Sequence, residues 1–260
     1  MLNLEQIVNY FPPYINENPS FRKYMVKEYI QLLILDFLSN SRWVKKLVFI
    51  GGTNLRIVKG LDRFSEDIDF DCKNLTDKEF RRITQEVVSY LKRFGFNVEE
   101  REHTGQKLSA FRSNLVFPGT LFDLGISSHK EEKFLIKIEC QDQGINYSSF
   151  VANIKGCGIF CVFPVPVDPV LCAMKISALL NRSKGRDFYD AIFLLGHAEP
   201  DFNFLSEKCN IHNYDELKTA LVNLVKSIDL KHKAKDFEHL LFNKLNNRRV
   251  INFSEFVNSM

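Results

Sequence analysis

The residue pattern with the clearest chemical potential in this chain is a pair of aspartates, Asp67 and Asp69, separated by Ile68. Side chains on a strand alternate between faces, so the two carboxylates are expected on one face and Ile68 on the other. Two carboxylates on one face repel each other unless a cation lies between them. Mg²⁺ prefers oxygen ligands and often shares its shell with phosphates. The spacing therefore predicts a magnesium site, with a solvated acidic strand edge as the alternative.

A glycine turn precedes this pair. Residues 47–50 are an apolar run that leads directly into Gly51, Gly52 and Thr53, and Ser65 follows two residues before the first aspartate. Such a turn, expected to open a short helix, lets backbone N–H groups approach a phosphate. The Thr53 hydroxyl is a candidate donor to a phosphate oxygen, and Ser65 is expected to position the loop or a phosphate. The chain has no GxxxxGK[ST] motif, which argues against a P-loop NTPase.

A third carboxylate is expected from a neighbouring strand. Residues 135–139 alternate between apolar and charged positions, and this pattern favours Glu139. Asp123, inside an apolar run expected to be a strand, is the rival, and Asp142 is the third choice. For each of these carboxylates the structural alternative is a cross-strand charge partner.

A lysine in an amphipathic helical stretch is the next candidate. Lys175 lies among apolar residues, and a lysine near a core needs an anion. That anion is either a bound triphosphate or a carboxylate of the following helix, Asp187 or Asp190. Arg182 and Arg186 are weaker candidates, for which an Arg–Asp tie between two helices is an equal alternative.

Taken together, these elements resemble the nucleotidyltransferases of the AbiEii/AbiGii toxin type, in the DNA polymerase β-like superfamily. The resemblance covers about residues 47–195: Gly-Gly-Thr with residues 63–70 resembles the first motif, residues 135–139 the strand beside it, and residues 175–190 the later motifs. It implies that Lys175 contacts nucleotide phosphates and that Asp190 is required for function.

The resemblance also implies an activity. We expect transfer of a nucleoside monophosphate from an NTP to an acceptor hydroxyl, assisted by Mg²⁺, with two ions expected. We further expect the toxin of a toxin–antitoxin or phage-defence pair, with a cognate antitoxin and the 3′ end of a tRNA as acceptor. The expected residues are Asp67, Asp69, Lys175 and Asp190 for catalysis, Asp67, Asp69 and Glu139 for metal, and Gly51, Gly52, Thr53, Ser65, Lys175 and Arg186 for substrate. The alternatives are an enzyme that modifies protein hydroxyls and a non-catalytic nucleotide-binding module.

Composition sets the remaining limits. The 260 residues are 45% hydrophobic and 26% charged, as in ordinary globular proteins. The six cysteines form no CxxC pair, which is typical of a reducing compartment. The N-terminus does not resemble a signal peptide and no apolar run approaches a bilayer span, so we expect a cytoplasmic protein without membrane association. The net charge is only +3, but the tail is rich in lysine and arginine, on solvated helix faces or a surface for RNA phosphates.

Periodicity predicts an α/β (α+β) protein in two parts. Residues 1–165 should form a core with N-terminal helices, for which the resemblance implies a polymerase-β-like fold with a mixed sheet, and residues 166–260 should form a helical C-terminal domain. The pattern predicts helices over 20–40, 53–59 and 76–94, and strands over 66–71, 96–101, 107–117, 120–126, 134–142 and 159–163. In the second part it predicts helices over 169–183, 186–195, 202–209, 214–228 and 232–246.

Overall fold

The fold is described from a computed structural model, which describes residues 3–102 and 110–260. The chain divides into two compact units. The first comprises the chain up to Gly60, Phe64–Gln143 and Val151–Val165. The second comprises Leu61–Arg63, Gly144–Phe150 and Pro166–Met260. The principal break therefore falls between residues 165 and 166, and two short earlier segments belong to the second unit.

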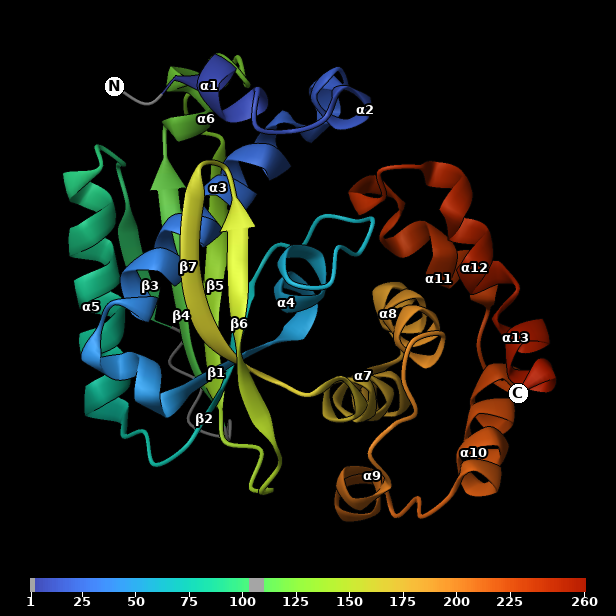
Figure 1. The fold of residues 1–260 in the computed structure, drawn as a ribbon. Helices are drawn as coiled ribbons and strands as arrows, with labels where there is room; N and C mark the ends of the chain where they lie inside the picture. Colours follow the sequence, from blue (N-terminus) through green and yellow to red (C-terminus); the bar gives the residue numbers. More distant parts are fainter. Residues whose placement is uncertain (1–2, 103–109) are drawn as a thin grey trace. The chain divides into compact units, whose positions relative to one another are not determined.

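A five-stranded mixed sheet, in the order β1-β2-β5-β4-β3, organises the first unit (Figure 1). Its strands are β1 (Leu47–Ile50), β2 (Ile68–Cys72), β3 (Glu99–Glu102), β4 (Ala110–Pro118) and β5 (Lys133–Gln141). The central pair β2–β5 is parallel, and the other three pairs are antiparallel. This mixed sheet with helices confirms the predicted fold class.

The two faces of the sheet differ in polarity. Ile68 and Phe70 of β2 and Ile136 and Ile138 of β5 are buried on one face. Two helices cover the apolar side: α5 (Asp77–Arg93) packs on β3 and β4, and α3 (Arg22–Ser39) packs beside α5. The α5 helix begins as predicted, with a capping box formed by Thr76 and Glu79. The opposite face carries the charged side chains of β2 and β5.

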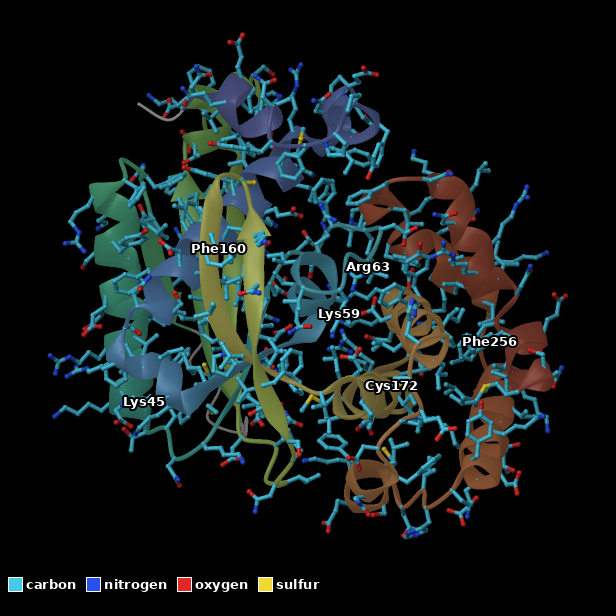
Figure 2. The ribbon with its side chains drawn as sticks, in the orientation of Figure 1. Lys45, Lys59, Arg63, Phe160, Cys172 and Phe256 are labelled. Carbon is cyan, nitrogen blue, oxygen red and sulfur yellow. The ribbon has the colours of Figure 1, made fainter. Side chains whose placement is uncertain are left out.

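A separate hairpin of β6 (Ser149–Gly156) and β7 (Ile159–Pro166) adds to the apolar side of the first unit. Its two-residue turn has positive φ at both positions, 50° at Cys157 and 75° at Gly158, as tight hairpins require. Phe163 packs inward, with its ring 5.5 Å from that of Phe70, whereas Phe160 on the outer face is 60% exposed (Figure 2). The sequence pattern predicted part of β7 and missed β6, because Cys-Gly is not a usual hairpin turn.

The remaining helices of the first unit are short. They are α1 (Leu4–Val8), α2 (Pro13–Asn16), η1 (Pro19–Phe21), η2 (Arg42–Lys46), α4 (Gly51–Ile57) and α6 (Thr120–Asp123). The predicted strand over 120–126 is wrong, since Gly119, at φ 72°, turns the chain into α6. The strand predicted over 107–117 corresponds to β4 from residue 110 onward, and residues 107–109 lie outside the described residues.

After Pro166 every element is helical. The helices are α7 (Asp168–Arg182), α8 (Gly185–Leu195), α9 (Phe202–Cys209), α10 (Tyr214–Lys226), α11 (Leu230–Asp236), η3 (Glu238–Leu240), η4 (Lys244–Asn247), α12 (Arg248–Ile251) and α13 (Phe253–Ser259). The single helix predicted over 232–246 is wrong, because the chain is extended at Leu241, which pairs with Arg63 in an antiparallel bridge. Across the described ranges, none of the helices combines the length and apolarity needed to span a bilayer.

Candidate active site

Three carboxylates share one face of the sheet in the first unit. Asp69 lies on β2, and Asp67 directly precedes this strand. The parallel register places Glu139 of β5 opposite Asp69. Because Ile68 is fully buried on the other face, Asp67 and Asp69 point together to the polar side, as predicted.

The glycine turn touches this carboxylate pair. Gly51 has a φ of +83°, and a Cβ placed on it would lie 2.2 Å from Oδ2 of Asp69. Antiparallel pairing of Ile50 with Asp69 creates this close approach. Only glycine fits there, both for space and for backbone conformation. The structure therefore brings Gly51 and Asp69 together, at the point where α4 begins.

Thr53 has a positioning contact. Its side chain is fully buried, and its hydroxyl donates a hydrogen bond to the backbone carbonyl of Asp67. The hydroxyl proton is therefore used in a hydrogen bond just before β2, whereas the sequence predicted a hydrogen bond to a phosphate oxygen. Thr53 holds the backbone of Asp67 in place.

The loop before Asp67 is fixed by the N-terminal helices. The Ser65 carbonyl accepts a hydrogen bond from Nε2 of Gln31 at 3.2 Å, and Glu66 pairs with Lys27 at 3.2 Å. Phe64 is buried in an aromatic cluster, with its ring 5.6 Å from that of Tyr24. Such contacts hold the aspartates in one geometry, which reduces the cost of ordering them around a substrate.

Sequence reasoning missed this role of α3. The available signal was a group of polar residues inside an otherwise apolar helix, namely Lys27, Glu28 and Gln31. All three are buried, and Glu28 also pairs with Arg56 of α4 at 2.8 Å. Buried polar groups of this kind need partners, so they indicate contacts with a neighbouring loop.

Glu139 is held by two cations. Arg112 of β4 donates to both of its carboxylate oxygens, at 2.8 and 3.2 Å. Lys137 Nζ lies 3.4 Å from Glu139 and 3.4 Å from Asp67. Burial alone would raise the pKa of Glu139, but Arg112 and Lys137 outweigh it and hold that pKa below its ordinary value. Neither Lys137 nor Arg112 was among the predicted site residues.

The rival carboxylates lie elsewhere. Asp123 is exposed on α6, and Asp142 is exposed just after the end of β5. Asp71 is buried and accepts a hydrogen bond from the backbone N–H of Gln143 at 2.9 Å, so it has a structural role. Of the candidates for a third carboxylate, Glu139 is therefore the one that faces Asp69.

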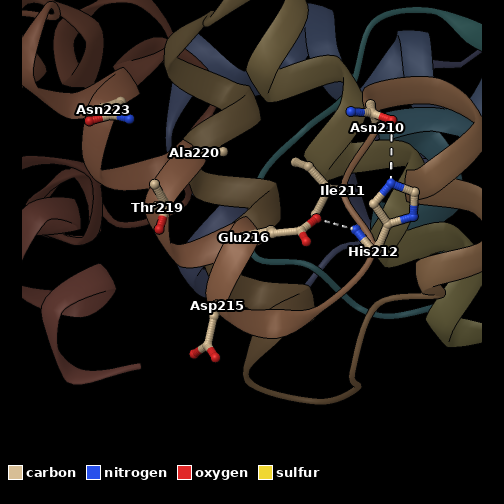
Figure 3. A pocket seen from close by; sticks show the side chains of 8 residues that line it. All are labelled: Asn210, Ile211, His212, Asp215, Glu216, Thr219, Ala220 and Asn223. Carbon is tan, nitrogen blue, oxygen red and sulfur yellow. Dashed lines mark hydrogen bonds between the residues drawn. The ribbon is translucent and has the colours of Figure 1, made fainter.

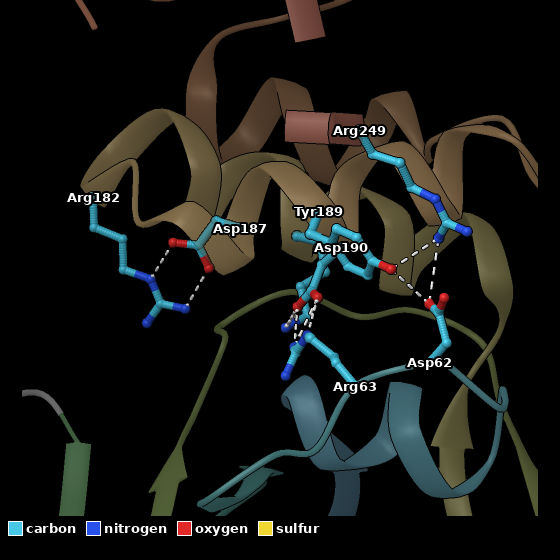
Figure 4. A network of polar contacts seen from close by, with 8 residues as sticks. Asp62, Arg63, Arg182, Asp187, Tyr189, Asp190 and Arg249 are labelled. Atoms are coloured by element: carbon cyan, nitrogen blue, oxygen red, sulfur yellow. Dashed lines mark hydrogen bonds and ion pairs between the residues drawn. The ribbon is translucent and has the colours of Figure 1, made fainter. Parts of the chain in front are cut away.

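In the second unit, Asp190 binds the predicted lysine, Lys175, and also Arg63, whose side chain points to Asp190 in Figure 4. Lys175 Nζ lies 2.8 Å from Oδ2 of Asp190, and Arg63 donates to both Asp190 oxygens at 2.8 Å. All three side chains are buried. Burial alone would raise the pKa of Asp190, but Arg63 and Lys175 outweigh it and lower that pKa. One buried carboxylate thus neutralises part of the charge of two buried cations.

Two further polar ties surround this cluster (Figure 4). Arg182 donates to both oxygens of Asp187, at 2.9 and 2.8 Å, which is the structural tie between α7 and α8 considered above. Tyr189 donates to Asp62 at 2.8 Å, and Arg249 donates to the Tyr189 hydroxyl at 3.0 Å. Arg186 is partly exposed and forms no ion pair with any residue in the described part of the chain.

One hollow of the second unit lies apart from the predicted residues (Figure 3). Its lining residues are Asn210, Ile211, His212, Asp215, Glu216, Thr219, Ala220 and Asn223. Glu216 accepts hydrogen bonds from the His212 backbone N–H and from Asn213, both at 2.8 Å. These contacts cap α10, so this hollow has a local structural explanation.

The acidic pair fits a magnesium ion. Within residues 3–102 and 110–260, no group of three His, Cys, Asp or Glu side chains is arranged to hold a metal. Mg²⁺, however, is commonly held by one or two carboxylates together with waters and substrate phosphates. Asp67 and Asp69 supply such a pair, and the lack of a side chain at Gly51 lets the Asp69 carboxylate lie directly against the start of α4.

A mixed sheet that presents two carboxylates beside a glycine turn is the arrangement of a nucleotidyltransferase. The chain belongs to the AbiEii family: the model of the nucleotidyl transferase AbiEii toxin of type IV toxin–antitoxin systems matches residues 33–245. This match confirms the resemblance that the motifs indicated.

Two solved structures share the fold. MenT4, a nucleotidyltransferase toxin from Mycobacterium tuberculosis H37Rv, aligns with a TM-score of 0.65 and 15% identity over 100% of this chain and 91% of that chain. JHP933 from Helicobacter pylori aligns with a TM-score of 0.54 and 19% identity over 91% and 92%. No curated protein matches the sequence.

Proposed function

We propose that the protein transfers a nucleoside monophosphate from an NTP to an acceptor hydroxyl and releases pyrophosphate. The observation that supports this most directly is the Asp67–Asp69 pair, held rigidly against Gly51. In nucleotidyl transfer the protein contributes mainly alignment and charge stabilisation. A preorganised pair of carboxylates serves both purposes.

In this proposal Asp67 and Asp69 hold the metal. Bound Mg²⁺ would supply Lewis-acid stabilisation of the phosphate oxygens. Glu139 has both oxygens engaged by Arg112, so its contribution is to order the face next to Asp69. One aspartate oxygen is proposed to accept the proton of the attacking hydroxyl. The two-ion arrangement expected from the sequence stays a prediction.

In the first unit, the backbone N–H groups of Gly51 and Gly52 are proposed to bind the phosphates, and in the second unit Lys175 and Arg186 are proposed as phosphate-binding residues in their own right. The Lys175 ammonium is oriented by Asp190, and Arg63 adds a second positive charge to that carboxylate. The presence of two cations in this cluster supports a role in binding an anionic substrate. Ser65, fixed through its carbonyl, is proposed to shape the loop that enters the site.

Membership of a type IV toxin–antitoxin family implies an antitoxin partner and an NTP substrate. For the acceptor we propose RNA, specifically the 3′ end of a tRNA. Charge distribution supports this proposal: residues 226–249 contain seven lysines and arginines against three acids, a local charge of +4 in a chain whose total is +3. Positive surfaces of this kind bind phosphates through counterion release.

The experiment combines the protein, Mg²⁺ and NTPs labelled at the α-phosphate with bulk RNA and bulk protein. We expect labelled macromolecule and free pyrophosphate. A product sensitive to nuclease supports an RNA acceptor, and a product sensitive only to protease supports modification of protein hydroxyls. Nucleotide binding without label transfer to any acceptor contradicts the catalytic proposal and favours a binding module.

A further inference from the structure

Lys137 lies at the centre of the acidic face. It follows Ile136 and precedes Ile138, both buried on the opposite side, so its side chain shares the face of Glu139. Its Nζ lies 3.4 Å from Oδ2 of Asp67 and 3.4 Å from Oε2 of Glu139. A single ammonium therefore bridges carboxylates from two adjacent strands.

The ion pairs of Lys137 are longer than the neighbouring Arg112–Glu139 pair. Strong charge-assisted pairs have separations of about 2.7–2.9 Å, and the Arg112–Glu139 pair reaches 2.8 Å. Lys137 is farther from both of its partners and its side chain is 28% exposed. A lysine ammonium is a point charge on a flexible stem, so it can leave one anion for another with little rearrangement.

The two carboxylates differ in what else holds them. Arg112 donates to both oxygens of Glu139, which leaves that residue paired whether or not Lys137 is present. In the described part of the chain, Lys137 is the only cation that forms an ion pair with Asp67. Asp67 is also one of the two residues proposed to bind the metal.

We propose that Lys137 is the resident counter-ion of Asp67 in the metal-free protein, and that a divalent cation must displace its ammonium to bind the Asp67–Asp69 pair. This inference rests on the metal site of the proposed function. The lysine relieves repulsion between the carboxylates of this face and lowers their affinity for the divalent ion. The phosphates of an incoming NTP offer the displaced ammonium a new anion.

The test measures Mn²⁺ binding to nucleotide-free protein by electron paramagnetic resonance, without reference to activity. The Lys137→Gln variant should bind Mn²⁺ about tenfold more tightly than wild type, because a positive charge close to the ion is removed. Lys137→Arg keeps the charge and should stay close to wild type. Lys133→Gln is the matched control on the same strand, since Lys133 is exposed and forms no ion pair among the described residues.

A double variant tests whether the effect of Lys137 on metal binding depends on Asp67. Asp67→Asn should weaken Mn²⁺ binding, and adding Lys137→Gln to it should raise the affinity by clearly less than the tenfold expected in the wild-type background. Circular dichroism of each variant checks the fold, and Lys137→Met replaces the glutamine variant if the latter fails to fold. Equal or weaker Mn²⁺ binding by the variant without the lysine overturns the inference.

The outcomes separate this inference from the proposed function. If wild type transfers nucleotide and binds Mn²⁺ while Lys137→Gln leaves the affinity unchanged, only the counter-ion role fails. If wild type neither binds Mn²⁺ nor transfers nucleotide, the metal site itself is wrong and both fail.

Discussion

The Asp69 carboxylate lies so close to Gly51 that a Cβ on the glycine would be 2.2 Å from Oδ2. The Gly51→Ala substitution should therefore displace Asp69 and reduce transfer by roughly a hundredfold, the effect typical of about 1 Å of misplacement. Gly60 is the matched control: it has a similar φ of +74°, and a Cβ there would meet nothing within 4 Å. Gly60→Ala should lose about 1–2 kcal/mol of unfolding free energy from backbone strain and keep its activity. Equal activity of the two variants would contradict the proposed contact.

Neutralising either aspartate should abolish transfer and leave the fold intact. Asp67→Asn and Asp69→Asn remove a metal ligand worth several kcal/mol, so we expect a loss of roughly a thousandfold in turnover. Removing one of two like charges on a face should not destabilise the sheet. Label transfer measures the first effect, and urea unfolding measures the second. Unchanged turnover in either variant refutes the metal assignment.

Lys175→Ala should weaken NTP binding, because a cation held by a buried carboxylate is lost. Fluorescence titration with a nucleotide analogue measures the affinity, and a decrease of roughly ten- to a hundredfold is expected for one charge-assisted hydrogen bond of roughly 1.5–3 kcal/mol. Lys208→Ala, an exposed lysine in α9, is the control. If NTP affinity is unaffected in Lys175→Ala, the lysine is purely structural.

Asp190→Asn should destabilise the protein, since Arg63 and Lys175 remain buried without their counter-charge. Breaking a buried pair in this way typically costs about 3–5 kcal/mol. Urea unfolding at neutral pH measures the loss. Arg182→Gln, which removes a half-exposed partner of Asp187, should cost less. A stability equal to wild type in Asp190→Asn would show that the cluster does not support the fold.

The lowered pKa of Asp190 predicts that the free energy of unfolding depends on pH. The pKa of Asp190 is lower in the folded protein than in the unfolded chain, where it is about 3.9. The ionised Asp190 therefore makes its full contribution to the free energy of unfolding above about pH 3.9, and this contribution is lost as the pH falls through the lower folded-state pKa. The difference in unfolding free energy between wild type and Asp190→Asn should therefore shrink as the pH drops below about 4. Urea titrations from pH 3 to 7 on both proteins check the sign. A difference that grows toward acid pH would contradict it.

A basic surface should make RNA binding depend on salt. Replacing Lys231, Lys233 and Lys235 of α11 by glutamine should weaken RNA binding by an inactive Asp67→Asn protein. The slope of log affinity against log salt should fall by about two to three, as expected for three lost phosphate contacts. The equal charge loss at Lys45, Lys78 and Lys92, which are exposed in the first unit, is the control. A larger effect of the control set would place the RNA elsewhere.

Local signals made much of this fold predictable. The Thr76 capping box, the proline that opens α7 and the alternation in β5 each determine an element from its own residues. The prediction failed at residues 120–126, where a positive φ at Gly119 overrides the apolar pattern, and at 232–246, where pairing of Leu241 with Arg63 interrupts a helix. Both errors depend on contacts or backbone geometry that periodicity does not encode.

The carboxylates of the candidate site were recognisable in the sequence, but the contacts that hold them in place were less so. Asp67 and Asp69 are recognisable from spacing, and Glu139 from alternation. Lys137 shares the face of Glu139 by the same alternation, but its contact with Asp67 and that of Arg112 with Glu139 depend on which strands pair, in the order β2-β5-β4. Sequence neighbours carry no information about that order, so these two contacts became visible only with the sheet.

The short segment Leu61–Arg63 groups with the helices that follow Pro166, although it lies about a hundred residues earlier in the sequence. A gene fragment encoding residues 166–260 would thus omit Arg63 and leave Asp190 with a single basic neighbour. The helical part is consequently not an exchangeable cassette. Chimaeras between relatives should carry residues 61–63 with it, since a graft at one junction would join an arginine from one parent to an aspartate from the other.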